Sequence, residues 1–287
     1  MRSLRSLMLP LAGLLFLTAA DRVAIPQPVQ PAPHVRLLPL QGGNNFRDLG
    51  GYRTRDGRSV RWGLLFRSGS MHSLTAADYT YLMSRGIRTV CDFRSVEERR
   101  SEPAAWPNDK APQILTDDYP MASLMSGIGL KPGQPATAAN VKAMMTASYP
   151  RMLTQFNGQY RRMFGELLAG RVPLAFNCSA GKDRTGIAAA LVLTALDVPH
   201  KTVVEDYLLT NRYFDPQKLG RGQNASAGGF GALPPDVLHA YMAADQDYIE
   251  AALKVIEGHA GGAAGYFRDE LGLSRADLLR LRRMYTA

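Results

Sequence analysis

The chain has 287 residues, of which 46% are hydrophobic and 21% charged, a balance that supports a substantial core and excludes wholesale disorder. Its Gly and Pro residues show no period, which excludes a collagen-like chain or a long coiled coil, and two cysteines exclude a disulfide scaffold or a four-cysteine zinc site. The net charge of +9 suits an anionic partner, which composition leaves open between nucleic acid, a membrane and a phosphorylated small molecule.

The first twenty residues have the layout of a signal peptide. Two arginines precede an apolar run from Leu7 to Leu17, and small residues follow it. This run is too short to span a bilayer. We therefore expect residues 1–20 to direct export to the periplasm or the medium, with an uncleaved signal anchor as the alternative. Residues 21–36 contain four prolines and predict an extended linker, so the folded domain is expected at 37–287.

Short apolar runs alternate with helical patterns through the first two thirds of this domain, which predicts an α/β fold built on a parallel sheet. Thr75 and Asp78 have the spacing of a helix capping box, and Gly86 ends that helix. Asp56-Gly57 predicts a tight turn. The expected strands lie within 62–66, 87–91 and 172–176, and the expected helices lie over 75–85, 160–168 and 185–196. A further helix is expected to end with residues 206–211, and a mostly helical tail to run from 236 to 285 with a break at 261–262.

Two segments interrupt this pattern. Residues 119–150 are rich in Gly and Pro and then weakly helical over 138–148, and they are predicted to form either a lid or a surface insertion. Residues 216–235 are again rich in Gly and Pro and predict a mobile loop.

The candidate site is the turn at 177–186, which reads Asn-Cys-Ser-Ala-Gly-Lys-Asp-Arg-Thr-Gly. Cys178 ends a predicted strand, and six positions later Arg184 opens a predicted helix. The backbone N–H groups between them form an anion cradle at a helix N-terminus, where the positive field favours a thiolate. Arg184 adds a planar fork that binds two phosphate oxygens. The pattern predicts a nucleophile aimed at phosphorus, and the alternative is a buried structural cysteine.

These residues resemble the bacterial branch of the cysteine-dependent tyrosine phosphatases, whose loop reads His-Cys-x-x-Gly-Lys-Asp-Arg-Thr-Gly. The resemblance covers roughly residues 37–287 and includes the segments 45–51, 66–69, 92–95 and 206–211. It implies a tyrosine phosphatase-like α/β domain with a parallel sheet, helices on both faces and additional C-terminal helices. It also implies metal-free hydrolysis of phosphotyrosine, while some members accept phosphoserine, phosphothreonine or phosphoinositides.

The resemblance assigns a role to each position of the loop. Cys178 attacks phosphorus and forms a cysteinyl-phosphate, and Thr185 helps the sulfur to leave. Asp183 is the implied general acid, with Asp92, Asp117 and Asp118 as rivals. Phosphate is bound by the loop amides and by Arg184, and Lys182 either extends the choice of substrate toward phosphorylated inositols or is simply solvated. The phosphate-binding residues are therefore expected to be Ser179, Ala180, Gly181, Lys182 and Arg184.

Four charged residues outside the loop are candidates for the pocket: Arg47, Arg67, Asp92 and Arg94. Their alternative role is in structural ion pairs, with Asp48 and Asp92 as the acids. Cys91 is expected to pack in its strand, or else to form a reversible disulfide with Cys178. The five histidines are scattered without a metal-ligand spacing, so no metal or cofactor is expected.

One residue departs from the family pattern. The residue before the nucleophile is Asn177 in place of histidine, and because asparagine carries no charge we expect reduced activity or a shifted pH dependence. The function predicted from the sequence is a protein-tyrosine phosphatase. The alternatives are a phosphoinositide or inositol-phosphate phosphatase and a non-catalytic phosphate-binding module. Nucleic-acid binding is disfavoured because the positive charges are scattered and no recognition motif is present.

Overall fold

The computed structural model describes residues 34–107, 111–125, 129–130, 133–218 and 233–287. The expected signal peptide lies outside these residues, as do almost all of the linker and most of the 216–235 loop. The described residues belong to one compact unit, His34–Ala287. Within this part of the chain, no helix combines the length and the hydropathy needed to cross a membrane.

The centre of the unit is a five-stranded sheet with the order β1-β2-β5-β3-β4. Strands β2, β5, β3 and β4 are parallel, as expected, but β1 pairs with β2 in the antiparallel direction. A parallel pair needs a crossover connection, usually a helix, and the segment between β1 and β2 contains none. The strands are β1 (Arg47–Asp48), β2 (Leu65–Ser68), β3 (Thr89–Asp92), β4 (Gln113–Thr116) and β5 (Leu174–Asn177).

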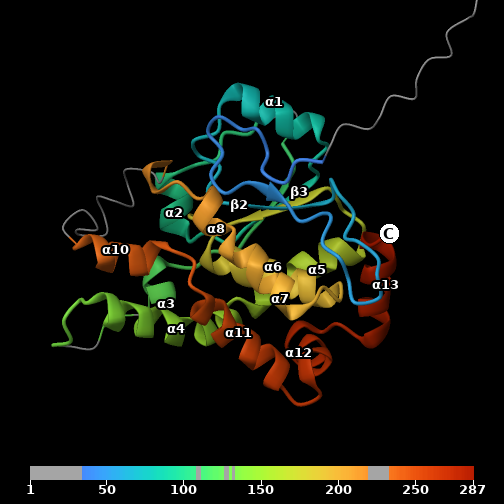
Figure 1. Cartoon of the computed structure of the whole chain (residues 1–287). Coiled ribbons are helices and arrows are strands. Elements are labelled where there is room, and N and C mark those ends of the chain that lie inside the picture. The colour runs from blue at the N-terminus through green and yellow to red at the C-terminus, as the bar shows by residue number, and fades with distance from the viewer. Residues whose placement is uncertain (1–33, 108–110, 126–128, 131–132, 219–232) are drawn as a thin grey trace, which may run out of the picture. The chain divides into compact units, whose positions relative to one another are not determined.

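Helices cover both faces of the sheet, which confirms the expected layering (Figure 1). The described helices are α1 (Ala76–Ser84), α2 (Val96–Ser101), α3 (Met121–Met125), α4 (Ala138–Gln155), α5 (Asn157–Leu168), α6 (Asp183–Ala195), α7 (His200–Leu208), α8 (Thr210–Tyr213), the 3-10 helix η1 (Pro216–Lys218), α10 (Pro235–Met242), α11 (Gln246–Gly258), α12 (Gly262–Leu271) and α13 (Arg275–Tyr285). Helix α1 lies on one face, and α4 to α7 lie on the other with the C-terminal helices (Figure 1).

The side chains of the strands divide between two buried clusters, because successive residues of a strand point to opposite faces. Phe66, Val90 and Ala175 join the cluster that contains Tyr79 and Leu82 of α1. Leu65, Cys91, Leu174 and Phe176 join the larger cluster on the opposite face. The capping box of α1 is confirmed, since Asp78 and Thr75 each accept the other's backbone N–H.

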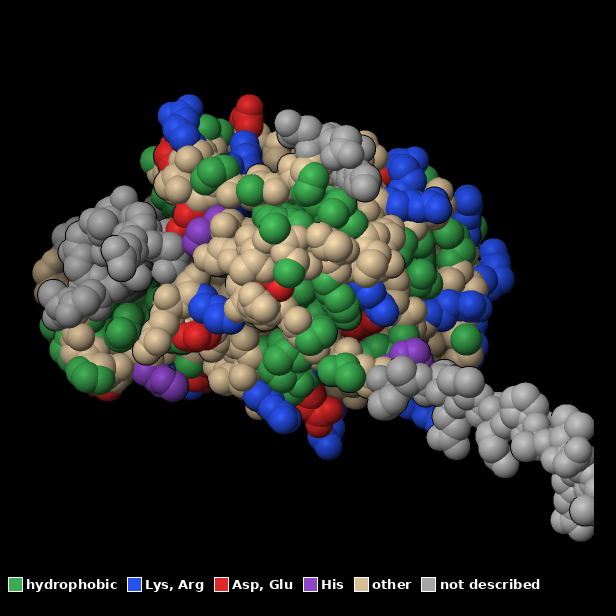
Figure 2. Space-filling view, turned by 90° about the horizontal axis from the view of Figure 1, so that it is seen from above, with side chains coloured by type: hydrophobic (Ala, Val, Ile, Leu, Met, Phe, Trp, Pro, Cys, Tyr) green, Lys and Arg blue, Asp and Glu red, His purple; other side chains and the backbone are tan. Residues whose placement is uncertain are grey.

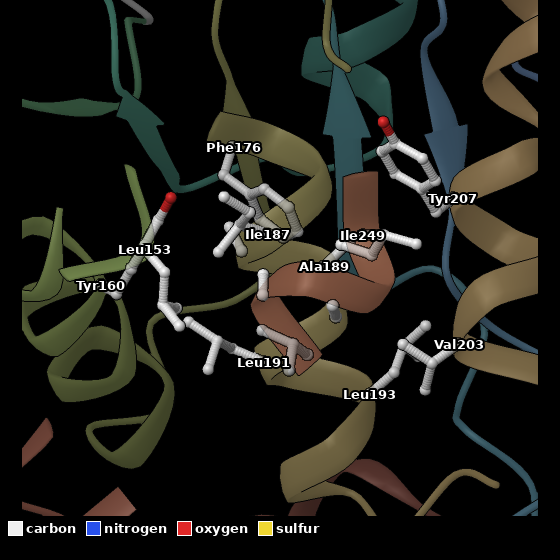
Figure 3. Close-up of a cluster of buried hydrophobic side chains, with 14 of the residues drawn as sticks. Leu153, Tyr160, Phe176, Ile187, Ala189, Leu191, Leu193, Val203, Tyr207 and Ile249 are labelled. Carbon is white, nitrogen blue, oxygen red and sulfur yellow. The ribbon is translucent and has the colours of Figure 1, made fainter. Parts of the chain in front are cut away.

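Helix α6 runs through the larger cluster and is almost entirely buried, as its apolar sequence predicts. Figure 3 shows Ile187 and Leu191 of α6 among side chains from α4, α5, α7 and α11, such as Leu153, Tyr160 and Ile249. The packing around α6 fixes the position of its first turn.

Three neighbouring parallel strands end in polar residues at the same edge of the sheet: Ser68, Asn177 and Asp92. Strand β2 continues to Ser68, two residues past its expected end, because Arg67 and Ser68 pair with Phe176 and Asn177 of β5. On the other side of β5, Asp92 of β3 is in register with Asn177. The loop that follows β5 therefore begins between the ends of β2 and β3, where ligands bind in open parallel sheets.

The segment at 119–150 contains α3 and most of α4. Thr137 caps α4 by accepting the N–H of Asn140, and the helix continues to Gln155, beyond its expected end at residue 148. Helix α4 packs against α10 and α11. It is thus part of the helical layer that also holds the C-terminal segment.

Figure 2 shows where the charged side chains lie on one face of the molecule. On the face shown in Figure 2, Lys and Arg side chains lie mostly around the rim, with Asp and Glu side chains between several of them. This face does not present the continuous basic stripe typical of nucleic-acid binding.

Candidate active site

The predicted loop lies between β5 and α6, with Cys178 directly after the strand and Asp183 at the first position of the helix. Gly181 adopts a left-handed backbone conformation, with φ of +68°. A Cβ there would come within 2.5 Å of the backbone nitrogen of Gly69. The loop therefore requires glycine at this position for two reasons, its conformation and its contact with the chain after β2.

The carbonyl oxygens of the loop are bonded to neighbouring segments. Asn45 Nδ2 donates to the carbonyls of Ala180 and Gly181, at 3.2 Å and 3.0 Å, and Arg67 donates to Gly181 O at 2.8 Å. The backbone N–H of Ser70 donates to Ser179 O at 2.8 Å. In the described residues, the backbone N–H groups of residues 179–182 have no acceptor. This leaves four consecutive donors for an anion, as a phosphate cradle requires.

The guanidinium of Arg184 is held by a residue that the sequence analysis missed. Arg184 Nη1 lies 2.7 Å from Glu98 Oε2, and Nη2 lies 2.7 Å from Glu98 Oε1, so the contact is bidentate. Nη1 also donates to the carbonyl of Phe93 at 3.0 Å and contacts the Tyr119 hydroxyl at 2.7 Å. The fork is thus fixed beside the loop before any substrate binds.

Glu98 is itself fixed by the start of α2. Its carboxylate accepts the backbone N–H of Ser95, and Ser95 Oγ accepts the N–H of Glu98, which completes a capping box. Glu98 also accepts a hydrogen bond from the hydroxyl of Ser179 in the loop. The sequence signal was the Ser-x-x-Glu spacing that starts at Ser95, the last residue of the segment 92–95, and it would have located Glu98.

Burial and pairing have opposite effects on the pKa values of Glu98 and Arg184. Burial raises the pKa of Glu98 and lowers that of Arg184, but mutual attraction and hydrogen bonding outweigh it. The pKa of Glu98 is lowered to about 2, and that of Arg184 is raised. Both groups are therefore charged at neutral pH.

We expect acid to destabilise the protein through Glu98. A carboxylate whose folded pKa is depressed stabilises the fold above its unfolded pKa, and this contribution is lost as the pH falls through the folded value. The window runs from pH 4.5 down to about 2, and the loss is on the order of 3 kcal/mol. Urea unfolding midpoints measured across this range should fall less steeply in Glu98→Gln. The exposed change Glu205→Gln should keep the wild-type slope, and equal slopes in all three proteins would contradict the assignment.

Asp183, the implied general acid, is partly exposed and held from within the protein. Its Oδ1 accepts the hydroxyl of Tyr149 at 2.6 Å and lies 3.3 Å from Lys182 Nζ. The side chain retains 23% of its exposure. Its rivals have other partners: Asp92 pairs with Arg94, Asp117 with Arg162 and Asp118 with Arg99, as ion-pair contacts of 2.7, 2.6 and 2.5 Å record.

Lys182 is not solvated, because its side chain is only 3% exposed. Its Nζ donates to the carbonyls of Tyr241 at 2.6 Å and Ala243 at 3.3 Å, where α10 ends and the chain leads to α11. It also lies 5.6 Å from the ring centroid of Tyr248. The ammonium group therefore connects the loop to the C-terminal helices, and this placement differs from the substrate-facing one that the sequence analysis considered.

The residues at either end of the loop are buried. Asn177 Nδ2 donates to Asp92 Oδ1 at 3.1 Å, and Asn177 Oδ1 has no partner among the described residues. Cys178 is 1% exposed and Thr185 is completely buried. The carbonyl of Arg184 accepts the hydroxyl of Tyr160 at 3.0 Å, which anchors the first turn of α6.

The three arginines that were candidates for the pocket form structural ion pairs. Arg47 and Arg67 both pair with Asp206 of α7, at 3.3 Å and 2.6 Å, and Arg94 pairs with Asp92 at 2.7 Å. Burial alone would raise the pKa of Asp206, but the two arginines lower it to about 2. The expectation that Asp48 is one of the partners is wrong.

Asp48 instead accepts the backbone N–H groups of Gly50 and Gly63, both at 2.7 Å. Arg67 bonds both to the Asp206 carboxylate and to the carbonyl of Gly181, so its ion pair with Asp206 helps to hold the loop in place. The segments 45–51, 66–69 and 206–211 of the resemblance meet there.

The two cysteines are both free thiols. Cys91 lies in the larger core cluster, and burial raises its pKa to about 12. It behaves as the small core residue that was expected. In the described residues, no group of three or more His, Cys, Asp and Glu side chains is placed to hold a metal ion.

The chain is similar in sequence to proteins that are named as tyrosine or triple specificity phosphatases. The chain is 33% identical over 253 residues to a Cupriavidus necator protein named as a candidate tyrosine-protein phosphatase, covering 85% of this chain and 86% of that one. It is 32% identical over 279 residues to the triple specificity protein phosphatase PtpB of Mycobacterium tuberculosis, covering 86% and 98%.

A solved structure of P. aeruginosa TpbA in complex with phosphotyrosine is a more distant match. Its TM-score is 0.29 and its identity 16%, covering 64% of this chain and 89% of that one. The family assignment therefore rests on sequence, because residues 38–287 match the model of the tyrosine phosphatase family. The chain belongs to the tyrosine phosphatase family.

Proposed function

We propose that this protein hydrolyses phosphate monoesters, phosphotyrosine foremost, through a cysteinyl-phosphate intermediate. The observation that supports this most strongly is the loop after β5, which carries Cys178, the Arg184 guanidinium and four backbone N–H groups that have no acceptor in the described part of the chain. Its relatives are named as tyrosine or triple specificity phosphatases.

The reaction has two steps, formation of the cysteinyl-phosphate and its hydrolysis. The Cys178 thiolate attacks phosphorus, an S–P bond forms, and the P–O bond to the leaving group breaks as Asp183 gives its proton to the leaving oxygen. Water then attacks phosphorus, Asp183 takes a proton from it, and the S–P bond breaks. Inorganic phosphate, the thiolate and the protonated acid are the products. Arg184 and the loop N–H groups stabilise the equatorial oxygens in both steps.

A substrate panel tests this function. We expect the purified protein to hydrolyse p-nitrophenyl phosphate in the presence of EDTA, and to release phosphate from a phosphotyrosyl peptide faster than from a phosphoseryl peptide or a phosphoinositide. A faster reaction with the phosphoinositide would make the lipid headgroup the preferred substrate. Phosphate binding without turnover of any substrate would make the protein a phosphate-binding module.

The contacts of Lys182 support the preference for phosphotyrosine. A second phosphate on an inositol ring needs a cation that faces the substrate, and the Lys182 ammonium is already bonded to the carbonyls of Tyr241 and Ala243. We keep dual specificity toward phosphoserine and phosphothreonine as the second candidate function, because PtpB is named a triple specificity phosphatase.

We also propose that the enzyme acts outside the cytoplasm, on the basis of the sequence pattern of residues 1–20. N-terminal sequencing of the protein recovered from the periplasm and the medium tests this, and the mature chain should begin close to residue 21. Recovery of the full-length chain from the cytoplasm alone would refute it.

A further inference from the structure

Two buried tyrosines connect the helical layer to the general acid. Tyr149 of α4 and Tyr207 of α7 are at most 1% exposed, and their hydroxyl oxygens lie 2.5 Å apart. The Tyr149 hydroxyl also donates to Asp183 Oδ1 at 2.6 Å. The result is a chain of three polar groups that begins in the core and ends at the partly exposed Asp183 carboxyl group.

Ring contacts and a close approach to the backbone hold the two tyrosines in place. The rings of Tyr149 and Tyr207 meet edge to face with centroids 6.1 Å apart, and Tyr248 of α11 lies 5.7 Å from Tyr149 on another side. Gly186, in the first turn of α6, allows Tyr207 to approach, since a Cβ there would lie 2.8 Å from the Tyr207 ring. Tyr207 is among the buried side chains of Figure 3.

The two carboxylate oxygens of Asp183 have different surroundings. Oδ1 contacts both the Tyr149 hydroxyl and the Lys182 ammonium, whereas Oδ2 has no hydrogen-bond partner among the described residues. A carboxylic acid whose one oxygen accepts two donors carries its proton on the other oxygen. Burial and the negative charge of Asp183 raise the pKa of Tyr149, so its hydroxyl remains a donor at every pH of interest.

We propose that Tyr149 is a positioning residue for acid catalysis, which holds Asp183 by Oδ1 so that Oδ2 delivers the proton to the leaving group, while Tyr207 holds Tyr149. This inference rests on the proposed function, because it concerns the acid of that reaction. It also gives the 119–150 segment a defined role, since α4 supplies the residue that aligns the acid.

The Tyr149→Phe variant tests the proposal through leaving groups of different basicity. A poor leaving group needs the proton and a good one hardly does, and general acid catalysis is worth roughly 10²–10⁴-fold. We expect kcat/KM, which reports the step in which the leaving group departs, to fall about 10-fold with phenyl phosphate, a fraction of that full effect, and less than about 3-fold with p-nitrophenyl phosphate. The affinity for inorganic phosphate should stay unchanged. Tyr207→Phe should give the same pattern at smaller amplitude.

Tyr285→Phe is the matched control, because Tyr285 is also buried and its hydroxyl donates to the carbonyl of Leu167, away from the loop. It should lower the melting temperature without changing the leaving-group dependence. In an Asp183→Asn background, Tyr149→Phe should cause no further loss of kcat.

Three outcomes separate this inference from the proposed function. Equal losses of kcat/KM with both leaving groups would overturn the role of Tyr149 while leaving the phosphatase intact. Additive losses in Asp183→Asn and Tyr149→Phe would overturn it as well. A wild-type protein without turnover of p-nitrophenyl phosphate would refute the proposed function first.

Discussion

Replacing Cys178 with Ser is expected to lower kcat/KM for p-nitrophenyl phosphate by roughly 10⁴-fold or more, since the nucleophile is removed from a set of groups that act together. A serine hydroxyl is hardly ionised at neutral pH, so it does not replace a thiolate. The variant should still bind phosphate, because the loop N–H groups and the Arg184 fork remain. Isothermal titration with inorganic phosphate would measure this binding alongside the activity assay.

The second cysteine provides the control. Cys91→Ser makes the same chemical change in the core, where burying a hydroxyl costs about 1–3 kcal/mol of stability. It should reduce the unfolding midpoint and keep turnover within a few-fold of wild type. If Cys178→Ser retained most of its activity, covalent catalysis by this residue would be wrong.

The second large effect is expected from Arg184→Lys, which should reduce kcat/KM by roughly 10²–10³-fold, the range typical for loss of one transition-state donor. An ammonium group cannot form the parallel bonds that Arg184 makes with Glu98 and presents no planar fork to a phosphoryl group. Activity and phosphate affinity should fall together.

Arg171→Lys is the corresponding surface change. Arg171 pairs with Glu166, and half of its side chain is exposed, so the pair contributes little to stability or activity. This variant should match the wild type in both assays. Near-normal turnover in Arg184→Lys would remove the guanidinium from the proposed reaction.

The sequence was most informative where local chemistry decides the structure. The loop from Asn177 to Gly186 was recognisable because its glycine, cysteine and arginine are each required at a fixed distance from a strand or a helix. The capping box of Thr75 and Asp78 was predictable for the same reason, since both partners lie within one turn.

The remainder of the site depends on residues that are distant in the chain. Arg47 and Arg67 share Asp206, which lies 139 positions after Arg67, and no local pattern distinguishes this acid from Asp48. Tyr149 and Tyr207 look like ordinary core positions of amphipathic helices until the fold brings their hydroxyls to Asp183. The antiparallel β1 was also hidden, because a strand of two residues has no periodicity to detect.

The bidentate contact between Glu98 and Arg184 has a consequence for the thermodynamics of substrate binding. Immobilising a free arginine side chain costs up to about 2 kcal/mol of rotamer entropy. In this protein that ordering takes place when the chain folds, because the guanidinium already has Glu98, Phe93 O and Tyr119 as partners. An incoming phosphate therefore meets a rigid receptor, and its affinity is not reduced by the ordering of this side chain. The same rigidity makes the site complementary to the inorganic phosphate that it releases, so the product should compete with the substrate.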